Sequence, residues 1–142
     1  MSVRLWMAPA STGGGAPLAK TPDHPVLVVD DEADARGILA MLLEMEGLPV
    51  RTARDGLEAL ELMREGLRPC VVLLDLMMPR LDGWGLVRAM RDDQLTEVPV
   101  VLLSGVADLE GSAADLGVAA ALTKPVDVDR LLDMVRAYCG RG

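Results

Sequence analysis

Four short runs along this chain are almost continuously apolar, and segments with helical spacing separate them. The runs cover residues 26–29, 70–74, 98–103 and 118–122, and a shorter, more polar run covers residues 49–53. Continuous apolarity is typical of parallel strands in a sheet that helices cover on both faces. The pattern therefore predicts a parallel sheet with the more polar strand at its edge.

Apolar residues recur at helical spacing between and after these runs. The expected helix faces are Ile38, Leu39, Leu42, Leu43 and Met45 before Gly47; Leu57, Leu60 and Met63 between Asp55 and Gly66; Leu86, Val87 and Met90 after Asp82; a weaker stretch over 108–115; and Val128, Leu131, Leu132, Val135 and Tyr138 after Asp127. Asp is a preferred residue at helix starts and Gly at helix ends. Five strands alternating with five helices predict an α/β fold built on a doubly wound, five-stranded parallel sheet.

The first 24 residues differ from the rest of the chain. Proline, glycine, serine and threonine interrupt any periodicity there. This composition predicts a flexible N-terminal tail over residues 1–24, followed by one folded domain over residues 25–140. A docking or targeting arm around Leu5, Trp6 and Met7 is the alternative interpretation of this segment.

The chain is acidic, with a formal net charge of −8 and an isoelectric point near 4.5. Affinity for nucleic acid comes mainly from Lys and Arg side chains that neutralise phosphates, so we expect no nucleic-acid partner. No apolar run approaches the roughly 18 residues of a membrane span, so we expect no membrane partner either. Cys70 and Cys139 lack metal-ligand spacing, and we expect Cys70 to be a small core residue in a reduced, cytoplasmic protein.

Polar side chains follow the apolar runs where each predicted strand ends. Asp30 and Asp31 follow the first run, and Asp75 ends the run at 70–74. Ser104 and Lys124 follow the last two runs. Since the carboxyl ends of parallel strands share one edge of the sheet, where ligands bind in open α/β folds, we expect these five side chains to converge.

Three carboxylates at close range repel one another, and a divalent cation would relieve that repulsion. Mg²⁺ suits a site with few carboxylates because it keeps several waters and takes phosphate oxygens readily. In that setting Asp75 is a candidate nucleophile that accepts a phosphoryl group. The alternative for each Asp is an ordinary cap of a helix or turn.

Composition singles out Lys124. Twelve of the fourteen basic residues are Arg, and the other lysine, Lys20, lies in the predicted tail. Because the chain otherwise uses Arg, a single Lys outside the tail indicates a position where the compact ammonium group and flexible side chain of Lys are needed. The alternative is an ordinary solvated lysine on a loop. The chain has no Gly-rich phosphate loop. Its one histidine, His24, precedes the first apolar run, which leaves no His-based catalysis at the strand ends.

The order and spacing of these motifs resemble the receiver domain of bacterial two-component response regulators. The matching segments are Val28-Val29-Asp30-Asp31-Glu32, Ala53-Arg54-Asp55-Gly56-Leu57-Glu58-Ala59-Leu60, Leu74-Asp75-Leu76-Met77-Met78-Pro79, Leu81-Asp82-Gly83, Leu103-Ser104-Gly105 and Lys124-Pro125. Together they extend over more than a hundred residues. The resemblance implies the flavodoxin-like fold of chemotaxis receivers, with strand order 2-1-3-4-5.

The resemblance also implies roles for individual residues. Asp75 would take a phosphoryl group from a His of a sensor histidine kinase or a His-containing phosphotransfer protein. Asp30, Asp31 and Asp75 would hold Mg²⁺, joined by the backbone carbonyl of Met77. Ser104 would hydrogen-bond the phosphoryl group, and Lys124 would pair with it.

Two features depart from the family pattern. Family members usually carry an aromatic residue three positions before the lysine, where this chain has Ala121. The stretch from Ser104 to Lys124 is about two residues short, and Gly111 interrupts the helix expected there. These departures alter the usual readout surface.

We therefore expect a stand-alone receiver, not an enzyme in the ordinary sense, which signals through protein partners or a phosphorelay. One alternative is an interaction module that keeps the fold but no longer switches. The other is a metal-dependent phosphatase on the same scaffold. The second alternative is disfavoured because Met77 stands where such enzymes usually have a second Asp.

Overall fold

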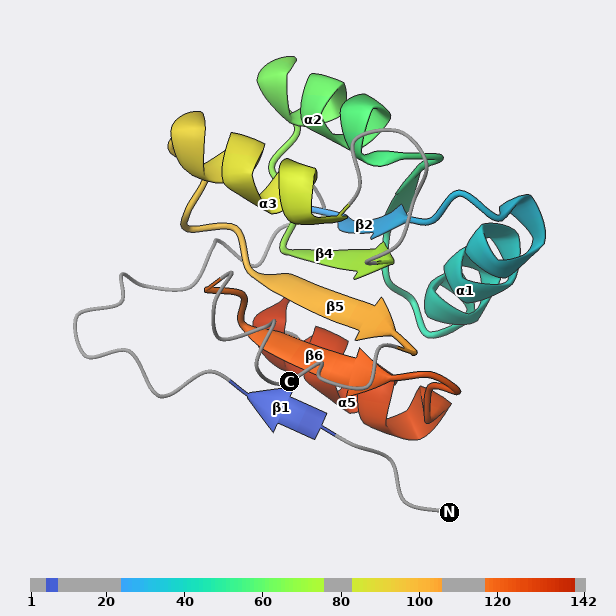
Figure 1. Cartoon of the computed structure of the whole chain (residues 1–142). Helices are drawn as coiled ribbons and strands as arrows, with labels where there is room; N and C mark the ends of the chain where they lie inside the picture. The colour runs from blue at the N-terminus through green and yellow to red at the C-terminus, as the bar shows by residue number, and fades with distance from the viewer. Residues whose placement is uncertain (1–4, 8–23, 76–82, 106–116, 140–142) are drawn as a thin grey trace.

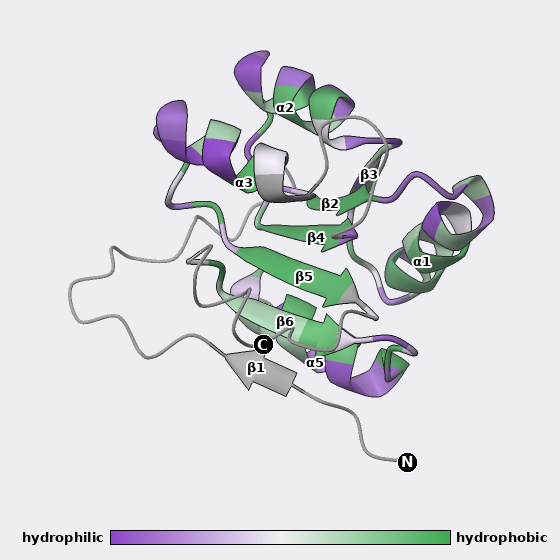
Figure 2. Ribbon diagram, viewed as in Figure 1, coloured by the Kyte–Doolittle hydropathy of each residue, from purple (hydrophilic) through white to green (hydrophobic). Residues whose placement is uncertain are grey.

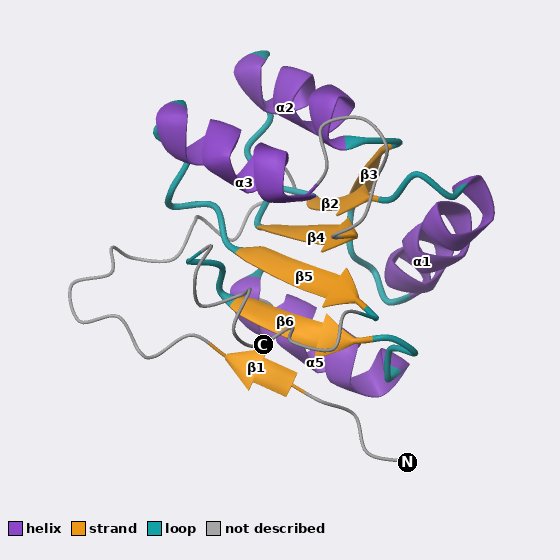
Figure 3. Cartoon of the chain, in the orientation of Figure 1, coloured by secondary structure: helices purple, strands orange, loops and turns teal. Residues whose placement is uncertain are grey.

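The computed structural model describes residues 5–7, 24–75, 83–105 and 117–139. Helices and strands alternate along most of this part of the chain (Figure 3). In chain order they are β1 (Leu5–Met7), β2 (Val26–Val29), α1 (Ala33–Met45), β3 (Val50–Ala53), α2 (Gly56–Arg64), β4 (Val71–Asp75), α3 (Gly83–Asp92), β5 (Val100–Ser104), β6 (Ala120–Thr123) and α5 (Val128–Tyr138). The helix expected over 108–115, the Asp82 cap and the backbone carbonyl of Met77 lie outside the described residues.

The strands form one sheet in the order β1-β6-β5-β4-β2-β3 (Figure 1). The five strands from β6 to β3 are parallel, and their order is the expected 2-1-3-4-5. The more polar strand β3 lies at the edge, as predicted. Strand β1 joins the opposite edge and runs antiparallel to β6.

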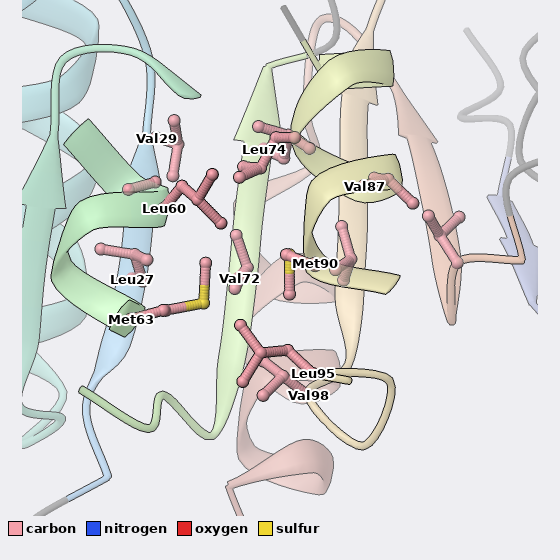
Figure 4. Packing of buried hydrophobic residues seen from close by; sticks show 14 of the residues in the cluster. Leu27, Val29, Leu60, Met63, Val72, Leu74, Val87, Met90, Leu95 and Val98 are labelled. Atoms are coloured by element: carbon pink, nitrogen blue, oxygen red, sulfur yellow. The ribbon is translucent and has the colours of Figure 1, made fainter. Parts of the chain in front are cut away.

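Successive residues of each inner strand enter two different cores, because side chains alternate between the faces of a sheet. Val26 and Val28 pack in a cluster with residues of α1 and α5. Leu27 and Val29 pack with residues of α2 and α3 on the other face (Figure 4). The inner strands are apolar up to their carboxyl ends, whereas the helices carry both apolar and polar residues (Figure 2). Both faces are thus covered, which explains the continuously apolar strands.

The helix ends follow the local sequence signals. Asp55 caps α2 by accepting a hydrogen bond from the Glu58 N–H, and the Glu58 carboxylate accepts one from the Arg54 N–H. Asp127 caps α5 by accepting a bond from the Arg130 N–H. Gly47 ends the turn after α1 with φ at 83°, a left-handed conformation that favours glycine.

Helix α1 buries a narrower face than the sequence pattern predicts. Leu43 is fully buried, whereas Ile38 and Met45 are 55% and 73% exposed. Met41 is also exposed, at 53%. The expectation that Ile38 and Met45 belong to the buried face is therefore wrong, because the helix contacts the sheet only along the part of its surface around Leu43.

Two expectations, one about the N-terminal segment and one about the cysteines, also need correction. Residues Leu5–Met7 are not part of a flexible tail, since they pair with β6 in the sheet. Cys70 and Cys139 are not separate reduced thiols, since they form a disulfide. Both features join segments that are far apart in the sequence, so no local pattern indicates them.

Candidate functional site

Three carboxylates lie close together at the C-terminal ends of the parallel strands. Strands β2 and β4 pair with Val29 opposite Leu74, so Asp30 and Asp75 are the next residues along these neighbouring strands. One carboxylate oxygen from each of Asp30, Asp31 and Asp75 lies within 4.8 Å of the others. Asp30 and Asp75 are partly buried and Asp31 is exposed. The predicted acidic cluster is therefore present.

Backbone and side-chain bonds fix Asp30. Its N–H donates to the Ala53 carbonyl at 3.2 Å, which continues the pairing of β2 with β3. Its Oδ1 accepts from the Glu32 N–H at 2.9 Å, and its carbonyl accepts from Arg36 Nη1 at 2.8 Å. Asp30 is thus held in place before α1 begins.

Lys124 reaches the same edge from β6. Its Nζ lies 3.4 Å from Oδ2 of Asp75, and its side chain is 42% exposed against 13% for that of Asp75. The peptide bond from Lys124 to Pro125 is cis. Lys124 is the only lysine among the described residues, so it is the one ammonium group that this part of the chain brings to the acidic cluster.

The backbone of Ser104 ends β5 at this edge. Asp75 pairs with Leu103, which places Ser104 one residue beyond Asp75 on the neighbouring strand. Ser104 also pairs with Thr123 of β6. The Thr123 hydroxyl oxygen is buried and has no hydrogen-bond partner within the described part of the chain. Sequence reasoning missed Thr123, although it too is a polar residue that ends an apolar strand.

The donor set fits Mg²⁺ better than a softer metal. It consists of carboxylate oxygens, without thiolate or imidazole ligands in the part of the chain that is described. An ammonium group on the same edge balances part of the negative charge. The site therefore has the chemistry of a hard-cation site with an ammonium group beside it.

The sequence that carries this site matches the model of a known protein family. The response regulator receiver domain model covers residues 26–136. The chain belongs to this family. Receiver domains are signalling domains, and they generally bind Mg²⁺ at acidic residues such as the Asp30, Asp31 and Asp75 cluster.

Known relatives support the assignment. A probable transcriptional regulator, ycf27 of Guillardia theta, is 41% identical over 118 residues, which cover 82% of this chain and 45% of the relative. The DNA-binding dual master transcriptional regulator RpaA of Synechocystis is 34% identical over 119 residues, with 82% and 49% covered. The chain thus spans about half the length of these curated relatives. The receiver domain of the Francisella response regulator 1452 superimposes with a TM-score of 0.76 at 32% identity, covering 83% of this chain and 98% of that one.

The expectation that nucleic acid plays no part is wrong. It rested on the net charge of −8, but RpaA is a DNA-binding regulator whose matched part resembles this acidic chain. The net charge of a receiver domain therefore does not exclude a role in a DNA-binding regulator. Among the described helices, none combines the length and the apolar character that crossing a membrane requires.

Proposed function

We propose that this receiver domain, over residues 25–140, accepts a phosphoryl group on Asp75 from a phosphohistidine of a sensor kinase or phosphotransfer protein. The observation that carries the proposal is the juxtaposition of Asp75 with two further carboxylates and one ammonium group. Three carboxylate oxygens lie within 4.8 Å of one another, and Lys124 Nζ is 3.4 Å from Asp75 Oδ2. An ammonium group and a cluster of carboxylates that could hold a cation, both beside Asp75, suit phosphoryl transfer, which needs positioning and charge stabilisation above all.

In the proposed reaction an oxygen of Asp75 attacks the phosphorus atom. The new P–O bond forms as the P–N bond to the donor histidine breaks, and the leaving imidazole takes a proton from solvent. Lys124 balances the charge of the transferred oxygens, and Ser104 donates a hydrogen bond to one of them. Asp30 and Asp31, with Asp75 and the Met77 carbonyl, are the proposed ligands of Mg²⁺, which when bound supplies a further positive charge for the phosphoryl oxygens.

We further propose that the phosphorylated domain acts on another protein or domain. It either relays the phosphoryl group or controls a partner, and a DNA-binding partner is one option because RpaA is a DNA-binding regulator. A carboxyl phosphate adds roughly −1.5 to −2 charge units at Asp75. That change in charge is what the partner would detect.

Phosphoryl uptake from a small donor tests the assignment of Asp75. The full chain is incubated with acetyl phosphate and Mg²⁺, and its intact mass is measured. We expect one added phosphoryl group in the wild type and in Asp129→Asn, a matched loss of an exposed carboxylate on α5. We expect none in Asp75→Asn.

Uptake that persists in Asp75→Asn would contradict the assignment. Absence of uptake in the wild type would instead favour an interaction module that keeps the fold without the chemistry. Circular dichroism of Asp75→Asn shows whether a negative result comes from unfolding.

A further inference from the structure

The disulfide between Cys70 and Cys139 joins two distant parts of the fold. The two residues are 69 positions apart in the sequence, and their Cα atoms are 5.0 Å apart. Cys70 directly precedes β4, and Cys139 directly follows α5 as its C-cap residue. The bond therefore ties the last turn of α5 to the amino end of an inner strand, at the edge of the sheet opposite Asp75.

The two cysteine residues differ in their exposure to solvent. Cys70 is only 3% exposed and belongs to the core cluster between the sheet and helices α1 and α5. Its N–H donates to the Pro25 carbonyl at 3.0 Å, which fixes it beside the start of β2. Cys139 is partly exposed at the end of α5 and only packs against that cluster. A reagent in solution can therefore reach Cys139 far more easily than Cys70.

We propose that Cys70 and Cys139 form a reversible thiol–disulfide couple that exchanges with low-molecular-weight disulfides through Cys139. Cys139 is the thiol that reacts with the external partner, and Cys70 is the buried thiol that completes the bond. The proposal does not depend on phosphorylation, since the couple lies five residues away from Asp75 along β4, about 16 Å at the rise of a parallel strand.

Oxidation by glutathione disulfide proceeds in two balanced steps. The Cys139 thiolate attacks one sulfur of glutathione disulfide, which breaks that S–S bond, forms a mixed disulfide and releases one glutathione thiolate. The Cys70 thiolate then attacks the Cys139 sulfur, forms the internal disulfide and releases the second glutathione thiolate. The two protons lost by the protein thiols end on the two glutathione molecules, and reduction follows the same steps in reverse.

The internal step needs no access to solvent. The attacking Cys70 sulfur is already beside Cys139, because the backbones hold their Cα atoms 5.0 Å apart. Helix α5 remains docked in either state through fully buried residues such as Leu131 and Val135. Reduction therefore releases the end of α5 without removing the helix from the sheet.

Glutathionylation of single-cysteine variants tests the asymmetry. Folded Cys70→Ser and Cys139→Ser proteins are incubated with glutathione disulfide, quenched with acid and measured by intact mass. We expect one glutathionyl adduct to accumulate in Cys70→Ser, because the resolving thiol is absent. We expect Cys139→Ser to react at least about tenfold more slowly, because its remaining thiol is buried.

The wild type provides a test that does not rely on the variants folding. Reduced full-length protein is alkylated in a time course under native conditions, and peptide mass spectrometry locates the label. Labelling of Cys139 before Cys70 is expected, together with slower amide exchange in the last turn of α5 after oxidation. Equal reactivity of the two thiols would overturn the proposal, as would a disulfide that glutathione opens only at the rate of global unfolding.

Discussion

The site that contains Lys124 and Asp75 has more negative than positive side chains. Lys124 is the more exposed partner, whereas Asp75 lies at the end of a buried strand. Asp30 is similarly fixed by its bonds to Glu32 and Arg36. Three carboxylates with one ammonium group leave a net negative site, which favours a divalent cation.

Mg²⁺ should therefore stabilise the folded protein. At a Mg²⁺ concentration ten times the Kd, binding contributes about 1.4 kcal/mol to the free energy of unfolding. We expect the Tm to rise by roughly 3–6 °C, as for a domain of this size. Differential scanning fluorimetry with Mg²⁺ and with EDTA measures the shift.

The matched variant for this experiment is Asp31→Asn, which removes the most exposed member of the cluster. We expect a smaller Mg²⁺ shift in this variant and an unchanged shift in Asp129→Asn. Equal melting of the wild type with Mg²⁺ and EDTA would contradict the proposed metal site.

A second charge contact connects α2 with the residue that follows α3. Arg64 Nε donates to Oδ2 of Asp93 at 2.7 Å, and Nη2 donates to Oδ1 at 3.3 Å. The hydrogen bond from Arg64 lowers the pKa of the Asp93 carboxyl and outweighs desolvation, which acts to raise this pKa; the charge of the same guanidinium also lowers it. A carboxyl with a lowered pKa in the folded state stabilises the fold above its ordinary pKa, and this contribution is lost as the pH falls through the folded pKa.

We therefore expect Asp93→Asn to lower the Tm slightly at neutral pH, where the wild-type carboxylate is ionised. The difference from the wild type should vanish below the ordinary carboxyl range, where Asp93 is protonated in both states. The effect is small because the pair is exposed. Asp92→Asn is the matched control, since Asp92 is an exposed neighbour at the end of α3. A difference that grows as the pH falls would contradict the role assigned to Arg64.

At the scale of elements, β1 determines whether β6 is an edge strand. Its residues Leu5, Trp6 and Met7 stand opposite Leu122, Ala121 and Ala120. Without β1, the outer backbone groups of an apolar strand would be unpaired, which is the situation that promotes association with other strands. The short strand therefore protects the edge of β6.

Removing residues 1–8 should expose half of the β6 amides. Alternate residues of a strand point their N–H groups to opposite neighbours, so one set of β6 amides faces β1 and the other faces β5. We expect the set that faces β1 to exchange about tenfold faster in the truncated protein, while the other set is unchanged. Hydrogen exchange followed by NMR measures both sets at once, and the set facing β5 is the internal control.

Two proline variants, Trp6→Pro and Met7→Pro, test the same contact without truncation. Alternate N–H groups of β1 face β6, so one of these two neighbouring substitutions removes a donor to β6 and the other serves as its control. The variant that removes the donor should accelerate exchange in the same amides. Unchanged exchange in the truncated protein and in both proline variants would mean that β1 does not protect β6 in solution.

The sequence predicted individual elements well where local signals were strong. The apolar runs marked the five parallel strands, and Asp55 and Asp127 marked the starts of α2 and α5. Periodicity was less reliable for α1, because it records which residues are apolar and not how wide the contact with the sheet is. A strand of three residues such as β1 carries almost no local signal, since its pairing with β6 depends on residues more than a hundred positions away.

At the scale of the whole molecule, the candidate site was predictable because parallel strands bring their carboxyl ends to one edge. That rule alone was enough to expect Asp30, Asp31 and Asp75 close together, and the register of β2 with β4 agrees. The disulfide was not predictable, because two cysteines in a sequence carry no information on whether their Cα atoms approach each other. The exclusion of nucleic acid is wrong because it rested on net charge alone, and RpaA, which is 34% identical over 119 residues, is a DNA-binding regulator.

Ala121 and the restraints on α5 lead to a prediction about how the fold responds to phosphorylation of Asp75. Family members usually have an aromatic residue at the position of Ala121, which here is fully buried between β5 and β1. Ala121 has no long side chain that could move when a phosphoryl group arrives at Asp75. Helix α5 is restrained by buried residues and the disulfide to Cys70, and by the ion pair of Arg136 with Glu46 after α1. We therefore expect phosphorylation to change β6 and α5 very little.

Backbone amide shifts with and without beryllofluoride, a phosphoryl mimic, test this prediction in the presence of Mg²⁺. We expect the largest changes close to Asp75, Gly105 and Lys124, and small changes at Ala121 and along α5. Asp75→Asn is the control, because it should not bind the mimic at all. A reduced sample isolates the contribution of the disulfide: if shifts spread into α5 only after the disulfide opens, the disulfide limits the response of that helix. Large shifts at Ala121 and throughout α5 in the oxidised protein would contradict the prediction, because the change would then reach α5 without an aromatic side chain at this position.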